Sequence, residues 1–146
     1  MKLSTRARYG TRVLLELSLR WGEGPVLLKD IAQRQEIPLP YLQQLIGPLV
    51  KAGIIKTTRG ARGGVSLLKP PKEVILSEVI KLLEGSISPA ACVDNPDLYP
   101  RSDSCVTHDI WAEVKRAMYG VLEATTFEDL VERQKLKGTL EQLKDR

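Results

Sequence analysis

Two cysteines and one histidine lie close together in the second half of the chain. Cys92 and Cys105 are its only cysteines, and His108, its only histidine, follows Cys105 by three residues. Two cysteines are too few for a disulfide framework, and in a reducing compartment such a pair is more often free, catalytic or metal-bound. The pair is open to interpretation as plain thiols, as a redox switch that closes a disulfide, or as part of a metal site.

A second group of residues has the chemistry of nucleic-acid contact. The segment Arg59-Gly60-Ala61-Arg62-Gly63-Gly64 combines two arginines with three glycines. Glycines allow the backbone to adopt positive φ and to approach a phosphate or groove wall closely, while arginines supply charge. Further upstream, Gln43 and Gln44 carry amides that can read adenine edges through bidentate hydrogen bonds.

The predicted helices before this basic segment form a helix-turn-helix. Ser4 can cap a first helix that runs to about Arg20, and residues 28–35 form a second helix of about two turns, which ends at Glu36-Ile37-Pro38. A third helix begins at about Leu39, and its apolar residues recur at helical spacing: Leu42, Leu45, Ile46 and Leu49. Pro48 predicts a kink or an early end of this helix.

The segments on either side of the basic residues read as strands. Ile54–Thr58 and Val65–Leu68 are rich in β-branched residues, which indicates a hairpin with a basic tip. Helix, turn, helix and hairpin in this order predict a winged helix, with a recognition helix that enters the major groove by its N-terminal residues. We therefore expect DNA contacts from seven residues: Pro40, Tyr41, Gln43, Gln44, Lys56, Arg59 and Arg62. Within this set, Arg59 suits a narrow minor groove, whereas Tyr41, Lys56 and Arg62 suit phosphates.

Charge is divided unevenly along the chain. Residues 1–72 contain 13 lysines and arginines against 4 acids, whereas residues 73–146 contain 9 against 14. Such asymmetry indicates a polyanion-binding part and a part with another task. A winged helix can also dock proteins, and the glutamines can merely face water, but the charge and the arginine-glycine segment favour DNA.

The second half predicts a dimerisation element. An amphipathic helix ends at Gly85, residues 86–104 form a cysteine-containing sensor loop, and a long helix runs from about Cys105 to Glu123. Its apolar stripe comprises Trp111, Val114, Met118, Val121 and Leu122, for which a second copy of the helix is the simplest partner and the chain's own domain the alternative. Thr126 and Asp129 cap a short terminal helix within 105–134, before a charged, frayed tail at 135–146. The fold class is mainly α: a winged helix-turn-helix domain at 1–85, with a two-stranded β wing, plus a long C-terminal dimerisation helix.

Four segments together resemble the IscR-type family of bacterial winged-helix regulators, whose relatives include NsrR, RirA and CymR. MKLSTRARYG, PLPYLQQL, LVKAGIIKTTRGARGGV and CVTHDIW stand in the order and spacing of that family over nearly the whole chain. The resemblance implies a homodimer that crosses through the long helix and binds a dyad-symmetric operator. It also places Tyr41, Gln43 and Arg59 on DNA-contact positions.

The same resemblance implies an iron–sulfur cluster as a sensor in many members. Cys92 and Cys105 match the outer two of three cysteine ligands, and His108 matches the histidine of the [2Fe-2S] type. The middle cysteine is missing, and Tyr99 stands at its position. Candidate fourth ligands are oxygen donors, weaker for iron than thiolate: Asp94, Asp97, Tyr99 and Asp103.

The sequence thus predicts a transcription regulator that binds double-stranded DNA at a palindromic operator as a homodimer. Control by a [2Fe-2S] cluster or by thiol redox state at Cys92, Cys105 and His108 is one hypothesis. Its rival is a cluster-free regulator that responds to a protein partner or a small molecule, which the missing thiolate favours. An enzyme has little support, because the chain has one histidine and no phosphate loop. No apolar run is long enough to span a bilayer, so we expect a cytoplasmic protein without a membrane partner.

Overall fold

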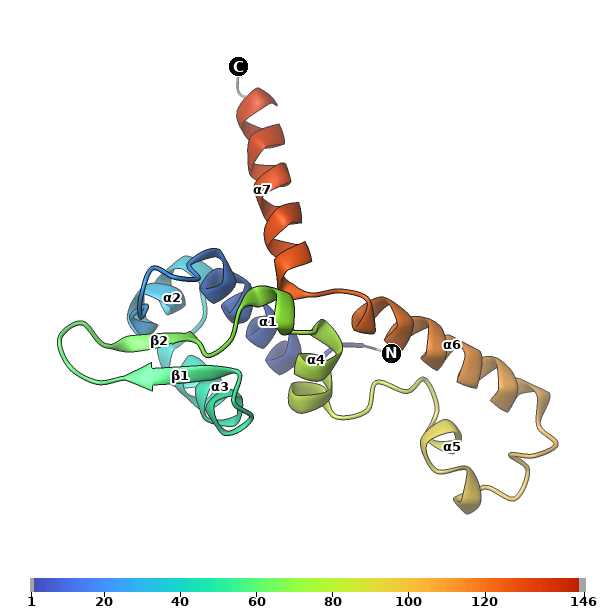
Figure 1. Cartoon of the computed structure of the whole chain (residues 1–146). Helices are drawn as coiled ribbons and strands as arrows, with labels where there is room; N and C mark the ends of the chain where they lie inside the picture. Colours follow the sequence, from blue (N-terminus) through green and yellow to red (C-terminus); the bar gives the residue numbers. More distant parts are fainter. Residues whose placement is uncertain (1, 145–146) are drawn as a thin grey trace.

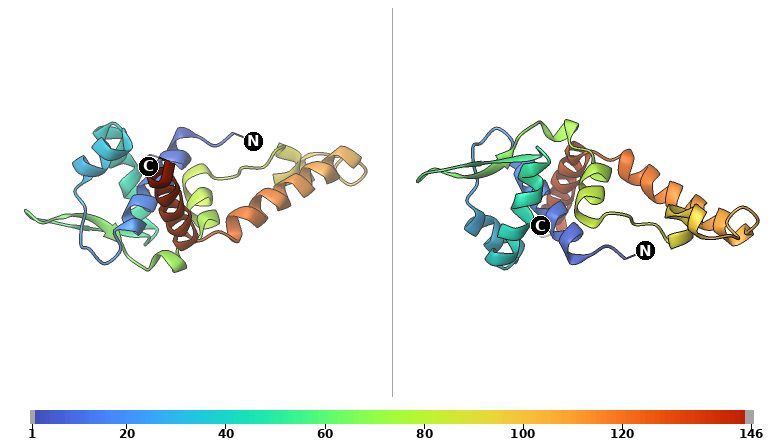
Figure 2. Two further views of the ribbon diagram at one scale, coloured as in Figure 1. Left: turned by 90° about the horizontal axis from the view of Figure 1, so that it is seen from above. Right: turned by 90° about the horizontal axis from the view of Figure 1, so that it is seen from below.

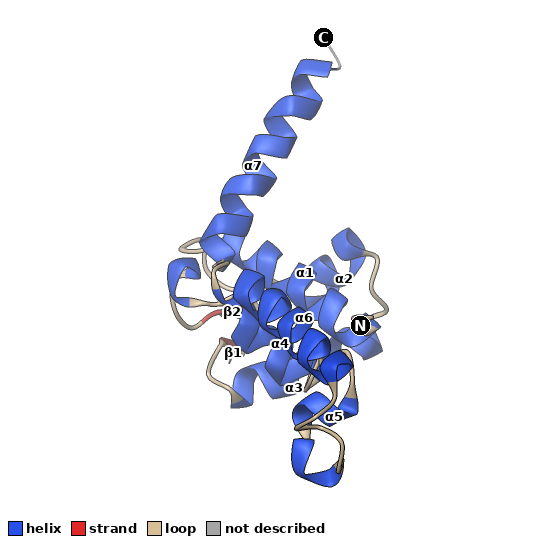
Figure 3. Ribbon diagram, turned by 90° about the vertical axis from the view of Figure 1, so that its right-hand side faces the viewer, coloured by secondary structure: helices blue, strands red, loops and turns tan. Residues whose placement is uncertain are grey.

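The computed structural model describes residues 2–144, with side chains up to Thr139. Its main elements are α1 (Thr5–Leu19), α2 (Leu28–Gln35), α3 (Leu39–Lys51), β1 (Ile55–Thr58), β2 (Gly64–Leu67), α4 (Leu76–Glu84), α5 (Ala91–Asp94), α6 (Val106–Glu123) and α7 (Phe127–Lys144). Figure 1 shows α1 to α4 and the hairpin gathered into one domain, from which α6 and α7 extend in different directions. The mainly α fold with one small sheet confirms the prediction (Figure 3).

The helix-turn-helix forms as the sequence predicts. Ser4 caps α1, because its hydroxyl accepts a hydrogen bond from the amide of Ala7 at 3.1 Å. The turn after α2 places Glu36 in the left-handed region, at φ 55°. Helix α3 then starts at Leu39 and continues through Pro48 to Lys51, so the expected early end is wrong. Burial of Leu49, beyond the proline, explains why the last turn persists despite one lost backbone hydrogen bond.

The hairpin pairs β1 with β2 in antiparallel register, with Ile55 opposite Leu67 and Thr58 opposite Gly64. Val26 adds an isolated bridge to Val65, which ties the chain before α2 to the wing. Glycine is required at the base of the tip: a Cβ at Gly63 would lie 2.1 Å from the Thr58 carbonyl oxygen, and one at Gly64 would lie 2.2 Å from that of Val26. The predicted glycine-dependent basic tip is therefore confirmed as a backbone feature.

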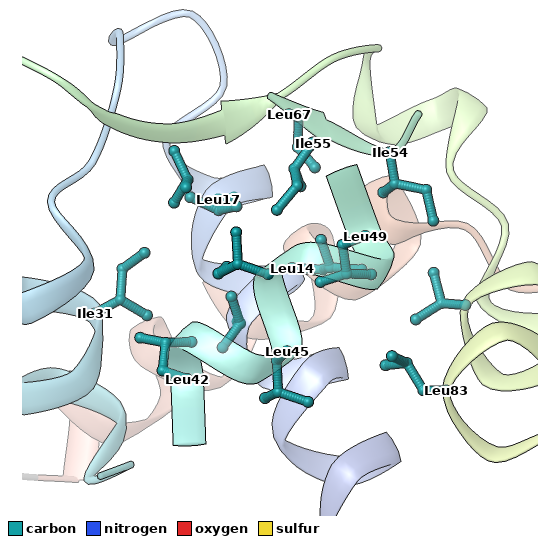
Figure 4. Close-up of a cluster of buried hydrophobic side chains, with 14 of the residues drawn as sticks. Leu14, Leu17, Ile31, Leu42, Leu45, Leu49, Ile54, Ile55, Leu67 and Leu83 are labelled. Carbon is teal, nitrogen blue, oxygen red and sulfur yellow. The ribbon is translucent and has the colours of Figure 1, made fainter. Parts of the chain in front are cut away.

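The hydrophobic core fills the space between α1, α3, α4 and the wing. Figure 4 shows leucines and isoleucines from these elements meeting in one cluster, with Leu14 of α1 at its centre. Gly10 lets α4 pack closely on α1, since a Cβ there would lie 2.2 Å from Cδ1 of Leu83. The apolar face of α3 is buried in this core, as its spacing predicts.

Helix α6 projects away from the domain together with the loop that carries α5 (Figures 1 and 2). None of its residues is buried, although it carries the apolar stripe noted in the sequence. Only its C-terminal end meets the domain, where half-buried Leu122 packs against the core. The alternative in which the helix packs back on its own domain therefore holds for that end alone.

The predictions of a short terminal helix and of a frayed tail after it are wrong. Helix α7 continues through Lys135 to Lys144, and only residues 145–146 of the expected tail lie outside the described residues. Thr126 and Asp129 do form the predicted reciprocal cap, each side chain accepting from the other's amide, at 3.2 and 2.9 Å. Residues 132–144 are rich in leucine, lysine, glutamate and glutamine, which propagate a helix that buried Phe127 and Val131 anchor.

Within residues 2–144, no helix combines the length and the apolar character that crossing a membrane requires.

Candidate nucleic-acid interface and cysteine loop

The N-terminal part of α3 presents polar residues to solvent. Pro40, Gln43 and Gln44 are exposed, while the opposite face of the same helix is buried in the core. This division follows from helical periodicity: residues 43 and 44 lie on the opposite side from 42, 45, 46 and 49. The two amides are therefore exposed, which a role in reading base edges would require.

Tyr41 is less free than its neighbours. Its ring is half-buried and packs edge-on against Tyr9 of α1, with ring centroids 5.7 Å apart and an interplanar angle of 87°. Packing against Tyr9 restricts the orientation of the Tyr41 ring, and therefore the direction in which its hydroxyl can meet a phosphate. No local pattern predicts this contact between α1 and α3.

The wing presents the remaining cations. Lys56, Arg59 and Arg62 are all exposed, and among the side chains of residues 2–139 none of them has an acidic partner. Basic side chains without acidic partners carry their full charge toward solvent, which is what attraction of a polyanion needs. The seven predicted DNA-contact residues thus lie on α3 and the wing, and six of them have exposed side chains.

The cysteine loop is held against α6 at one point. The carboxylate of Asp94, on α5, accepts a hydrogen bond from Nζ of Lys115 at 2.9 Å and another from the hydroxyl of Ser86. The bond from Ser86, and then that from Lys115, lowers the pKa of Asp94. Asp94 is therefore engaged in fastening the loop and is poorly placed to serve as a metal ligand.

Cys105 occupies the cap position of α6, and Cys92 lies on α5. Both thiols are free and half-buried, and the sulfur of Cys105 lies 3.1 Å from the hydroxyl oxygen of Thr107. That hydrogen bond, assisted by the backbone at His108, lowers the pKa of Cys105. Nδ1 of His108 is buried and has no hydrogen-bond partner among the described residues.

These donors do not fit an iron–sulfur cluster as they stand. Across the described part of the chain, no three histidine, cysteine, aspartate or glutamate side chains lie close enough together to hold a metal ion. Asp97, Tyr99 and Asp103 are exposed, and among the described residues neither aspartate belongs to a group of three such donors. The family spacing puts the missing cysteine six residues after Cys92, which is Leu98, so the expectation that Tyr99 stands at its position is off by one residue.

Comparison with known proteins covers almost the whole chain. Residues 3–133 match the family model Rrf2, described as an iron-dependent transcriptional regulator. The chain is 44% identical over 131 residues to protein rrf2 of Nitratidesulfovibrio vulgaris, which covers 90% of the chain and 87% of that protein. The chain belongs to the Rrf2 family.

Two solved Rrf2-type structures have the same fold. The global cysteine regulator CymR of B. subtilis superposes with a TM-score of 0.79 and 37% identity, covering 91% of this chain and 98% of that one. IscR of T. potens gives 0.76 and 36%, covering 92% and 88%. The resemblance inferred from the sequence is thus confirmed, as are the winged helix and the exclusion of an enzyme. Like other Rrf2 proteins, the chain is a DNA-binding transcription regulator.

Proposed function

We propose that this Rrf2 protein occupies a palindromic operator as a homodimer joined through α6. The observation that carries the proposal is the exposure of large apolar residues along α6: Ile110 is 48% exposed, Trp111 39% and Val121 67%. A row of such residues on a projecting helix favours burial against a partner. A second α6 is the partner of matching shape, and its twofold axis would give two recognition helices and two wings facing one DNA duplex.

On this duplex, each residue of the interface has a distinct task. Gln43 and Gln44 read base edges in the major groove, with Pro40 at the entry of the helix. Tyr41, Lys56 and Arg62 contact phosphates, and Arg59 enters the minor groove beside the recognition site. The exposure of these side chains, apart from that of Tyr41, supports the assignment.

Control by thiol oxidation is the mechanism that the cysteine loop supports best. Cys105 has a lowered pKa and occupies the N-cap position of α6, so its thiolate is the nucleophile of the pair. Oxidation by a diazene such as diamide removes two electrons and two protons from Cys92 and Cys105; one S–S bond forms and the diazene is reduced to a hydrazine. Because α5 contacts α6, such a bond would draw the first turn of α6 toward the loop.

We expect diamide to weaken operator binding by at least about fivefold, the lower end of allosteric coupling, because a displaced α6 changes the spacing of the two recognition helices. The duplex is first selected from a random pool with the reduced protein, and affinity is then measured by fluorescence anisotropy before and after oxidation. Mass spectrometry follows formation of the Cys92–Cys105 bond in the same samples.

The controls are Cys92→Ser and Cys105→Ser, each of which removes one partner of the bond. Both variants should bind the duplex as the reduced parent does and should lose the response to diamide. An affinity that is unchanged in fully disulfide-bonded protein contradicts thiol control and leaves the protein-partner or small-molecule rival.

Iron–sulfur control is a second candidate, favoured by the buried and unpartnered Nδ1 of His108, three residues from Cys105. Its weakness is the missing third thiolate. We expect protein purified without oxygen to be colourless, whereas Leu98→Cys or Tyr99→Cys should absorb in the visible range and hold about two irons per protomer if a [2Fe-2S] cluster forms. Colour and iron in the parent would instead make Cys92, Cys105, His108 and an oxygen donor a sufficient ligand set.

A further inference from the structure

One face of α1 makes a series of polar contacts with the end of α2 and an aromatic contact with the start of α3. Its centre is Glu16, whose side chain is only 6% exposed. Oε1 of Glu16 accepts from Nη1 of Arg34 at 2.7 Å, and Oε2 accepts from Nε2 of Gln35 at 3.2 Å. A further cation, Arg20, lies 3.8 Å away on α1 itself. A buried carboxylate is retained at low cost when it is paired and hydrogen-bonded in this way.

The series continues from Gln35 to the recognition helix. Arg12 donates to the side-chain oxygen of Gln35 at 3.1 Å and also to its backbone carbonyl. The guanidinium of Arg12 lies over the ring of Tyr9, 5.4 Å from its centroid, and Tyr9 packs against Tyr41. The α1 residues concerned are spaced three and four apart, so they share one face of the helix.

These contacts hold the end of α2 and the start of α3 against α1, on either side of the turn that joins the two helices. Gln35 is the last residue of α2, and Tyr41 is the third residue of α3. On its other sides α1 contacts α4 and α7, the helices that flank the cysteine loop and α6 along the chain (Figure 1). Helix α1 is therefore the element that joins the recognition helix to the C-terminal half.

We propose that Glu16, with Arg12 and Tyr9, is a positioning residue of the DNA-binding head, which sets the angle at which α3 meets the major groove. The proposal rests on DNA binding through α3. It does not depend on how the cysteine loop is controlled, nor on dimerisation through α6. None of the three residues needs to touch DNA, since the effect is transmitted through Gln35 and Tyr41.

The test is Glu16→Gln, because two explanations predict opposite signs. Removing an acid from a basic domain should strengthen binding to any DNA if bulk electrostatics governs affinity. A positioning role predicts that affinity for the selected duplex falls about tenfold, the upper part of the range for substitutions that act on coupling from a distance, whereas affinity for a scrambled duplex does not fall. Circular dichroism at the assay temperature verifies that the variant is folded.

The matched control is Glu23→Gln, which makes the same charge change at an exposed glutamate just beyond α1. Equal affinities of folded Glu16→Gln and Glu23→Gln for the selected duplex would overturn the proposal. Tyr9→Leu provides a second variant without any charge change, should Glu16→Gln fail to fold. It removes the ring that bridges Arg12 and Tyr41, and it should also lower selected-duplex affinity while sparing the scrambled duplex. If the parent itself did not distinguish the two duplexes, the proposed function would fail rather than the role of Glu16.

Discussion

Trp111→Glu should convert the protein from a dimer into a monomer and reduce its affinity for the selected duplex by about 100-fold or more. A charge on the exposed apolar face of α6 would have to be buried, unpaired, against a second copy of the helix. In a dimer, binding of one DNA-binding domain raises the effective concentration of the other at its half-site, which increases affinity by about 10²–10⁴-fold. A monomer loses this gain. Sedimentation velocity measures the mass, and anisotropy measures the affinity.

Arg116→Gln is the control for this substitution. Arg116 is exposed and lies away from the apolar stripe of α6. Its substitution by glutamine lowers the net charge by one, as Trp111→Glu does. It should leave both the mass and the affinity as they are in the parent. If Trp111→Glu remained dimeric, the interface would have to lie elsewhere, with α7 the next surface to substitute.

The parts of the fold that could be predicted from sequence are those that local patterns specify. Ser4 marks the start of α1, the spacing of Leu42, Leu45 and Leu49 specifies the buried face of α3, and Gly63 stands at the base of the hairpin tip where a side chain would clash. Each of these signals acts over a few residues, so the sequence alone carries it. The exposed polar face of α3 and the basic wing follow from the same local rules.

The features that sequence reasoning missed depend on contacts between distant segments. The early end that Pro48 offered for α3 does not occur, because the packing of Leu49 carries the helix past the proline. Helix α7 extends well beyond its expected end because Phe127 and Val131 anchor its start in the core. The network around Glu16 could not be predicted, because Arg34, which pairs with its carboxylate, lies 18 residues away in the sequence.

The candidate sites divide in the same way. Residues proposed to act from one exposed surface, such as Gln43 and Arg59, could be nominated from element type and charge. Metal ligation requires several donors at one point, which spacing along an irregular loop does not determine. The cysteines therefore allowed several interpretations in the sequence. The structure was needed to show that an ion pair between Asp94 and Lys115 attaches the loop to α6.

Arg59→Ala should weaken binding to the selected duplex by about 10- to 100-fold, the effect of removing one specific arginine contact. Arg59 is exposed at the tip of the wing, beside Gly60 at φ 105°, and has no acidic partner among the described residues. A guanidinium inserted into a narrow minor groove gains from the enhanced negative potential of A·T-rich steps. The loss should therefore be largest for duplexes with such steps where the wing lies.

Two comparisons separate this role from simple charge. Arg133→Ala removes the same charge from α7 and should change affinity less than about twofold, since that helix points away from the recognition face (Figure 1). Gln43→Ala should relax base preference in the major groove while preserving the preference at the wing. Arg59→Ala could instead lose affinity equally on A·T-rich and G·C-rich flanks, with the slope of log affinity against log salt concentration reduced by about one phosphate contact. Arg59 would then be a phosphate ligand, and the minor-groove assignment would be wrong.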